Sequence, residues 1–143
     1  MSGRGTRHRA REAALQVLYS LDVGRSRDRT PEEAFDAVAA HFELPRAAHD
    51  FARQLALSVA VSRDELDELI RLHSHRWRLE RMAAVDRNIL RLAAFELMKT
   101  DTPTGVVIDE AVELARRFGD DPSPAFVNGI LDALARSLRG SGE

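Results

Sequence analysis

The run from Val106 to Asp132, VVIDEAVELARRFGDDPSPAFVNGILD, constrains the fold more than any other part of the chain. Its apolar residues recur at helical spacing on both sides of a short polar break. Gly119 is expected to follow the first helix, and Ser123 with Pro124 to supply the N-cap and first-turn proline of the second. The run therefore predicts two helices that meet across a short acidic loop.

Helical periodicity continues along the rest of the chain, and no segment alternates long enough to require a β-strand. The expected helices span about residues 9–22, 31–42, a stretch opened by Pro45, a stretch opened by the S-x-x-E pattern at Ser62, a stretch ending near Lys99, 108–118 and 124–139. Short connections between them predict a single all-α domain of about seven helices over residues 1–143, with residues 1–8 as a flexible basic arm.

Two details of this pattern bear on the core. The first helix should place one apolar stripe against its neighbours, formed by Ala10, Ala14, Val17, Leu18 and Leu21. In the last helix, a close helix crossing or a nearby backbone is the simplest reason for a glycine at position 129, because a mid-helix glycine costs up to about 1 kcal/mol relative to alanine. Trp77 is expected in a short linker or single turn.

The composition excludes several classes of protein. The chain has 143 residues and no cysteine, so neither a disulfide framework nor a thiolate metal site can form. It contains no apolar stretch of the roughly 18 residues that a membrane span needs, and no secretory signal. No catalytic or phosphate-binding motif is present, and His73 and His75 are not spaced as metal ligands. We therefore expect a cytoplasmic protein that is not an enzyme and needs no cofactor.

The distribution of charge favours RNA binding at the N-terminus. The net charge is only −2, but residues 1–11 contain no acid and carry a cluster of basic residues. Its members are Arg4, Arg7, His8, Arg9 and Arg11. Gln16 and Tyr19 fall on the same helical face as Arg9, which predicts a surface for stacking and hydrogen bonding. The alternatives are a solvated, frayed terminus and a tyrosine at the edge of the core.

Three segments together are similar to one protein family: RHRAREAALQVLYSLD at residues 7–22, AVDRNILRLAAFEL at 84–97 and IDEAVELARRFGDDPSPAFVNGILD at 108–132. The chain resembles the NusB family of bacterial transcription antitermination factors along nearly its whole length. The resemblance implies a fold of two small packed helical bundles. It also implies a protein that binds boxA RNA jointly with ribosomal protein S10 (NusE), in the RNA polymerase antitermination complex that transcribes ribosomal RNA.

The resemblance also implies roles for particular residues. The RNA-binding set is the N-terminal basic cluster with Gln16 and Tyr19, and the region around Asp121, Ser123 and Phe126. Asp86 and Arg87 correspond to the surface that faces S10. The loop at Asp120, Asp121 and Pro122 departs from the pattern in being acidic and stiff. Members of the family form monomers and dimers, so a homodimer is possible.

Two other functions stay open on the sequence. One is a purely protein-binding helical module, in which the arginines would not matter for RNA. The other is a domain like the NusB-like N-terminal domain of certain ribosomal RNA cytosine methyltransferases. The second is disfavoured, because the chain has no cysteine to act as a catalyst and no room after the last helix for a methyl-donor domain.

Overall fold

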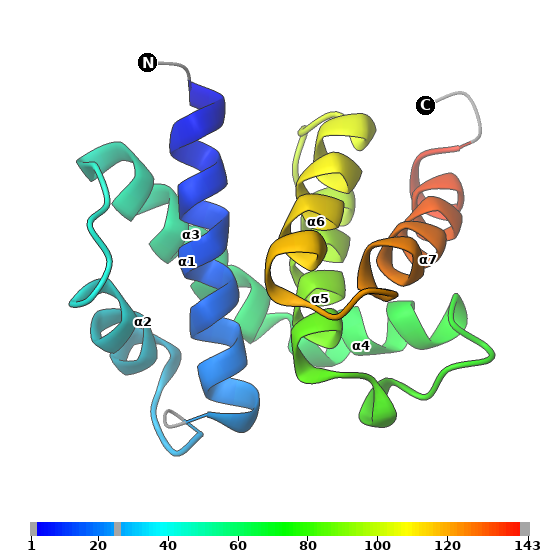
Figure 1. The fold of residues 1–143 in the computed structure, drawn as a ribbon, viewed down its shortest axis with the longest axis horizontal. Helices are drawn as coiled ribbons and strands as arrows, with labels where there is room; N and C mark the ends of the chain where they lie inside the picture. The colour runs from blue at the N-terminus through cyan, green and yellow to red at the C-terminus, as the bar shows by residue number, and fades with distance from the viewer. Residues whose placement is uncertain (1–2, 25–26, 141–143) are drawn as a thin grey trace. The chain divides into compact units, whose positions relative to one another are not determined.

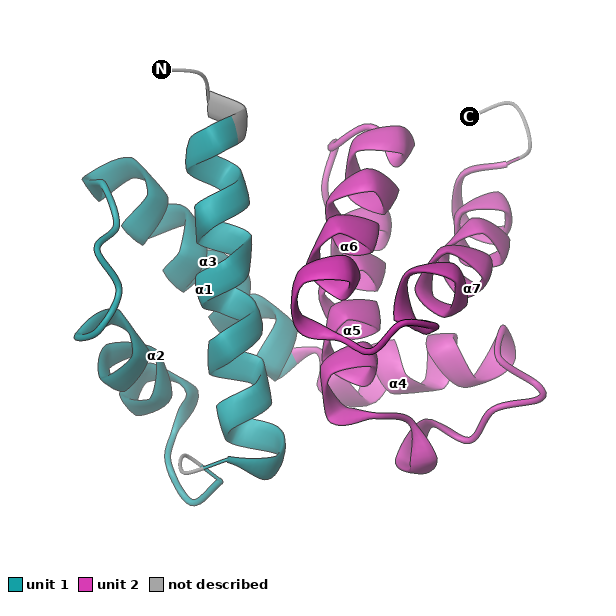
Figure 2. Cartoon of the chain, in the orientation of Figure 1, with its two compact units in different colours: residues 1–61 teal, residues 62–143 magenta. Residues whose placement is uncertain are grey.

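The computed structural model describes residues 3–24 and 27–140, with side chains from residue 5 onward. Within this part the chain is entirely helical, with seven α-helices, one short 3₁₀ helix and no strand (Figure 1). The predicted all-α fold class is confirmed. The chain divides into two compact units, residues 1–61 and residues 62–143 (Figure 2).

The first unit is a bundle of three helices built around small side chains. It contains α1 (Gly3–Val23), α2 (Pro31–Ala39) and α3 (Arg46–Val61), and α1 packs on both of the others. The predicted stripe on α1 is buried except at Leu21, which is half-buried. The buried residues of α3 include three alanines spaced one turn apart, Ala48, Ala52 and Ala56, together with Leu55 and Val59. Alanines on both helices let their axes approach closely, since the interaxial distance depends on the side chains at the contact.

Helix α1 starts earlier than the sequence pattern indicates. Its backbone is helical from Gly3, so residues 3–8, expected to form a flexible arm, are its first two turns. Arginine is a good helix former, and local contacts support these turns. The Nε2 atom of His8 lies 3.1 Å from the Glu12 carboxylate, and Arg9 donates a hydrogen bond of 2.8 Å to the backbone carbonyl of Glu43.

The capping box forms at α2 and not at α4. The Thr30 hydroxyl accepts from the Glu33 N–H at 3.1 Å, and the Glu33 carboxylate accepts from the Thr30 N–H at 3.0 Å. Ser62, where the S-x-x-E pattern predicted a box, makes no capping hydrogen bond. An N-cap needs extended backbone. Thr30 has it at φ −72° and ψ 159°, whereas Ser62, in the tight junction between α3 and α4, has ψ 10°.

The second unit is built around a helix that is buried on nearly all sides. It contains α4 (Arg63–Leu72), the 3₁₀ helix η1 (Leu79–Arg81), α5 (Ala84–Lys99), α6 (Thr104–Phe118) and α7 (Ser123–Arg139). Helix α5 packs against α4, α6 and α7, and ten of its residues are buried. Six of these ten residues are apolar, and the others are Asp86, Asn88, Arg91 and Glu96, so the centre of the bundle also contains polar groups.

Two arginines tie the helices of this unit together. Arg91 on α5 meets Asp67 on α4 through two hydrogen bonds, Nε to Oδ1 at 2.7 Å and Nη2 to Oδ2 at 3.0 Å, and both side chains are buried. Arg139, at the end of α7, donates to four backbone carbonyls between residues 96 and 102 and to the Thr104 hydroxyl. Those carbonyls belong to the end of α5 and the loop after it, where carbonyls lack the regular partners of a helix interior.

The loop between α6 and α7 differs from the prediction at Gly119 and at Ser123. Gly119 ends α6 in extended backbone, with φ −98° and ψ −169°, and not in the left-handed region. Position 119 requires a glycine because there is no room for a side chain. A Cβ there would lie 2.6 Å from the Ser123 hydroxyl oxygen and 2.9 Å from the Ala115 carbonyl oxygen. Ser123 is the first residue of α7 and not its N-cap, and its hydroxyl accepts from the Asp120 N–H at 3.1 Å.

The close helix crossing expected at Gly129 is absent. A Cβ built there meets no atom within 4 Å, and Gly129 is exposed with its neighbour Asn128. Leu72, at the end of α4, is also exposed. No helix in the described part of the chain has the length and apolar character to cross a membrane.

Candidate nucleic-acid interface

The basic cluster at the start of α1 divides between two sides of the helix. Arg7 is exposed, and its guanidinium lies 4.6 Å from the centre of the Phe51 ring on α3. Arg9 is also exposed and is steadied by its hydrogen bond to the Glu43 carbonyl. The side chain of Arg4 lies outside the described residues. Arg7 and Arg9 therefore present cationic groups to solvent from positions held by unit 1.

Arg11 does not share this exposure. Only 3% of its surface is accessible, and its guanidinium lies 5.6 Å from the centre of the Phe51 ring. The physical reason is helical geometry: positions 14, 15 and 18, on the same face as residue 11, are all buried. Arg11 thus supports the packing of α1 on α3, and direct contact with RNA, expected from the sequence, does not fit its burial.

The opposite side of α1 carries the predicted polar surface. Gln16 is exposed, and Tyr19 is 41% exposed, large for an aromatic residue. Gln16 also lines a surface hollow of about 500 Å³ together with Arg29 and residues of α2. His8 is half-buried beside Glu12. Arg9, Gln16 and Tyr19 are therefore exposed on one side of α1, with the buried Glu12 and Ala13 between Arg9 and Gln16.

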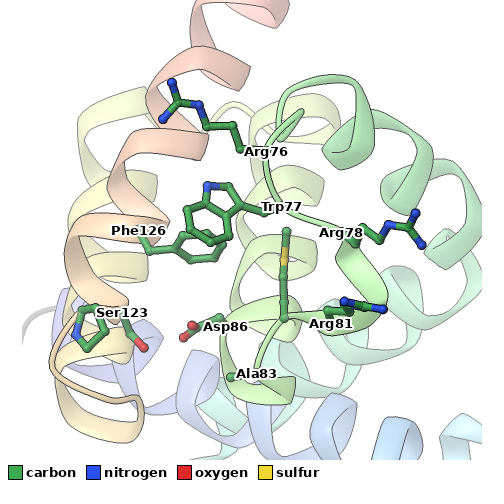
Figure 3. Close-up of a pocket in the computed structure, with 10 residues that line it drawn as sticks. Arg76, Trp77, Arg78, Arg81, Ala83, Asp86, Ser123 and Phe126 are labelled. Atoms are coloured by element: carbon green, nitrogen blue, oxygen red, sulfur yellow. The ribbon is translucent and has the colours of Figure 1, made fainter.

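Unit 2 holds a second candidate site, which we call the aromatic cleft. It is a cavity of about 600 Å³ bounded by the segment from residue 76 to residue 86 and by the start of α7. The residues that line it are Arg76, Trp77, Arg78, Arg81, Met82, Ala83, Asp86, Pro122, Ser123 and Phe126. Figure 3 shows Trp77 against Phe126, with Asp86 facing Ser123 below them. The rings of Trp77 and Phe126 meet edge to face, with centres 5.5 Å apart and planes at 87°.

Asp86 gives the cleft a buried carboxylate. It is 8% exposed, and its Oδ1 atom has no hydrogen-bond partner among the described residues. Burial raises the pKa of the Asp86 carboxyl above its usual range, and the charge of Asp120 adds to this. The Ser123 hydroxyl donates a hydrogen bond to this carboxylate, which opposes the rise in pKa. Ser123, at 2% exposed, is thus a link between the α6–α7 loop and α5.

The other predicted residues of this region have different surroundings. Asp121 is exposed in the α6–α7 loop and does not line the cleft. Arg87, expected to face S10, is half-buried, and its Nη1 atom lies 3.3–3.4 Å from the carbonyl oxygens of Leu79, Glu80 and Met82. Its guanidinium therefore holds the η1 turn that forms one wall of the cleft.

The basic rim of the cleft was not predicted from the sequence. Arg76, Arg78 and Arg81 are exposed around Trp77, which is 55% exposed although it is the largest side chain of the protein. The pattern R-W-R at residues 76–78, a tryptophan between arginines outside any helix, is the signal that could have identified them. In the described ranges, no group of three or more His, Asp or Glu side chains is arranged to hold a metal ion.

The sequence of this chain matches known proteins along both units. A family model described as the NusB family matches residues 8–136. The chain is 48% identical to the transcription antitermination protein NusB of Anaeromyxobacter dehalogenans strain 2CP-1, over 92% of each chain. It is 46% identical to the protein of that name from Myxococcus xanthus, over 94% of this chain and 97% of the relative.

Solved structures of NusB proteins also match this chain in fold. NusB of T. maritima matches with a TM-score of 0.82 and 35% identity, over 91% of this chain and 90% of that one. The structure of antitermination factors NusB and NusE in complex with dsRNA matches with a TM-score of 0.81 and 31% identity, over 93% and 98%. Since the family model spans most of the chain and the relatives are similar along nearly their full length, this chain belongs to the NusB family.

Proposed function

We propose that this chain is a transcription antitermination factor that binds boxA RNA together with ribosomal protein S10 during ribosomal RNA transcription. The observation that carries the proposal is the near full-length match to transcription antitermination proteins, at 48% identity over 92% of each chain. The similarity in fold to a NusB protein in complex with NusE and dsRNA supports both partners. On this proposal the protein is a cytoplasmic adaptor of the antitermination complex and not a catalyst.

The surface of α1 supplies a physical reason for RNA binding. Its first turn contains no acidic residue, while Arg7 and Arg9 lie close behind and are exposed. Positive charges near a helix N-terminus are locally unfavourable because they oppose the helix dipole. A polyanion bound there would offset that cost. We propose that Arg7 and Arg9 contact phosphates, and that Gln16 and Tyr19, further along the same helix, contact bases.

The residues around Asp86 and Arg87 indicate how each of them could contribute to S10 binding. The Arg87 guanidinium faces backbone carbonyls of the η1 turn, so we propose that it serves S10 binding only by holding that turn. Asp86 lies in the aromatic cleft with Phe126. The exposed Asp121 stays a proposed RNA neighbour, although its charge disfavours contact with phosphate.

The test is fluorescence anisotropy of labelled boxA RNA with this protein, with and without S10, against a scrambled RNA. We expect selective binding that S10 tightens. In an Arg7→Ala/Arg9→Ala variant, the slope of log affinity against log salt should fall by about 1.4, since each phosphate contact to a single strand contributes about 0.7. The matched control is Arg116→Ala/Arg136→Ala, which removes two exposed arginines paired with acids on their own helices.

Two results would contradict the proposal. Equal affinity for boxA and scrambled RNA, unaffected by S10, would refute the antitermination function. An unchanged salt slope in the Arg7→Ala/Arg9→Ala variant would remove those residues from the RNA surface.

A further inference from the structure

We propose that the surface hollow between α1 and α2 binds a small phosphate monoester, in which one phosphate group is joined to a short apolar body. This hollow, which we call the α1–α2 hollow, measures about 500 Å³ and lies wholly within unit 1. Pockets of this size hold small ligands. The inference concerns a ligand other than RNA and S10, and it goes beyond the proposed function.

The first observation is a set of polar side chains that converge on the hollow from three segments. Gln16 and Ser20 come from adjacent turns of α1, Arg29 from the loop between α1 and α2, and His41 from the turn after α2. Each of them can donate a hydrogen bond, and none bonds or pairs through its side chain with another described residue. The described residues that line the hollow include no acid. Donors grouped in this way are suited to a ligand rich in acceptors.

The second observation is the charge of Arg29, which no described acid neutralises. Arg71, also exposed, pairs with Glu80 at 2.9 Å. Arg29 has acids near it in the chain, but the Glu33 carboxylate accepts from the Thr30 N–H at 3.0 Å. The guanidinium group of Arg29 is therefore available for two parallel hydrogen bonds to the oxygens of a phosphate.

The positive groups of the hollow favour a monoester over other anions. Arg29 is always charged, and His41 adds a second positive charge when it is protonated. A phosphate monoester carries a charge of about −1.5 to −2 at pH 7 and has three strong acceptor oxygens. A phosphodiester of RNA carries a single charge, and a carboxylate has only two oxygens. The monoester therefore matches both the charge and the number of donors.

The third observation is an apolar surface beside the donors. Val38, near the end of α2, and Phe42, in the turn that follows, also line the hollow, and both are half-buried. Inorganic phosphate would leave this surface in water. A ligand with an apolar body would cover it and gain from its burial. The ligand is therefore an organic phosphate and not the free ion.

The surroundings of the hollow disfavour a longer ligand. Helix α2 exposes Glu32, Glu33 and Asp36 to solvent. An RNA strand that continued along α2 would bring further phosphates to these carboxylates, and an acidic protein segment would bring its own. Like charges repel, so both macromolecules are disfavoured there. A ligand with a single phosphate group meets the donors without this repulsion.

The first experiment is a titration of the full ¹⁵N-labelled chain with phenyl phosphate, followed by the NMR shifts of the backbone amides. Inorganic phosphate, phenol and benzoate are titrated in parallel at constant ionic strength, because exposed charges are screened by salt. We expect saturable shifts concentrated at residues 16, 20, 29, 41 and 42. The Kd of phenyl phosphate should be about ten-fold lower than that of inorganic phosphate or phenol, since each of these carries only one of the two parts.

Variants with matched controls test the polar residues. Arg29→Ala should weaken phenyl phosphate binding about ten-fold, because charged hydrogen bonds to the phosphate are lost. Arg27→Ala, which removes an exposed arginine of the same loop that does not line the hollow, should leave the Kd unchanged. Gln16→Glu should also weaken binding about ten-fold by adding a negative charge, whereas Gln54→Glu on α3 should not. Circular dichroism confirms that each variant is folded.

Four results would overturn the proposal. Equal effects of Arg29→Ala and Arg27→Ala would show a general attraction of anions to the loop. Shifts concentrated at Arg7 and Arg9 would place the phosphate at the start of α1. Equal Kd values for phenyl phosphate and inorganic phosphate, or for phenyl phosphate and benzoate, would remove the apolar body or the phosphate from the ligand. A fall of about 0.7 in the salt slope of boxA RNA binding in Arg29→Ala would make the hollow part of the RNA surface.

Discussion

The buried pair of Asp67 and Arg91 should be the most sensitive point in unit 2. The two hydrogen bonds between them, at 2.7 Å and 3.0 Å, join α4 to α5, and Arg91 donates a third bond of 3.0 Å to Asn88. In Asp67→Ala, the guanidinium stays buried with its main counter-charge removed. Breaking such a pair from one side costs about 3–5 kcal/mol, because an uncompensated charge is left in the interior.

That loss is a large part of the 5–15 kcal/mol by which a native protein is typically stable. At about 2–4 °C for each kcal/mol in a chain of this size, the Tm should fall by about 10 °C. The double variant Asp67→Leu/Arg91→Met removes both charges and fills similar volume, so it should recover most of the stability. It should remain about 1 kcal/mol below the wild type, because Asn88 loses a donor.

The assay is urea unfolding followed by far-UV circular dichroism, with thermal melts in low and high salt. Salt should change the result little, since a buried pair is poorly screened. A cost below about 1 kcal/mol for Asp67→Ala would show that the pair behaves as a solvated one. A double variant as unstable as the single one would show that packing, and not uncompensated charge, caused the loss.

The remaining predictions concern single substitutions at four positions. Arg139→Ala should cost about 2 kcal/mol in urea unfolding, because four carbonyls lose a charged donor, whereas the exposed Arg136→Ala should cost under about 0.5 kcal/mol. Gly119→Ala should cost about 1–3 kcal/mol, since its Cβ would lie 2.6 Å from a hydroxyl oxygen of α7. Gly129→Ala, with open space around its Cβ, should instead gain up to about 1 kcal/mol, and equal effects at the two glycines would contradict the argument. Because burial raises the pKa of Asp86 in the folded state, that state binds the proton more tightly, and stability falls as pH rises from the unfolded pKa through the folded one. Asp86→Asn lacks this loss, so its stability relative to wild type should be higher at pH 7 than at pH 3 in urea unfolding; an unchanged difference would refute the shift.

Much of the local structure could be predicted because it depends on neighbours in the chain. The apolar stripe of α1 and the end of α5 near Lys99 could be predicted from helical periodicity, which needs only residues three or four positions apart. Thr30 caps α2 because threonine, proline and two acids stand together in the sequence. Exposed Arg7 and Arg9 were also found from a local excess of positive charge.

The candidate site was predictable only in part. Phe126, Ser123 and Asp86 were named from a family resemblance, but nothing in their spacing showed that they line one cleft. Trp77 was placed in a linker, and the arginines beside it were missed. The burial of Arg11 was overlooked because a cluster of charge was given more weight than its place on the helical face.

By itself, the sequence of this protein determined that the chain is all-α and where its main apolar stripes lie, since both depend on interactions within a few residues. Only the tertiary structure decided which polar groups lose contact with water. Asp67 and Arg91 are 24 positions apart, and Trp77 and Phe126 are farther apart still. Such pairs meet only when helices pack. Burial then makes Arg91 a charged link between two helices, and it leaves the Oδ1 atom of Asp86 without a hydrogen-bond partner among the described residues.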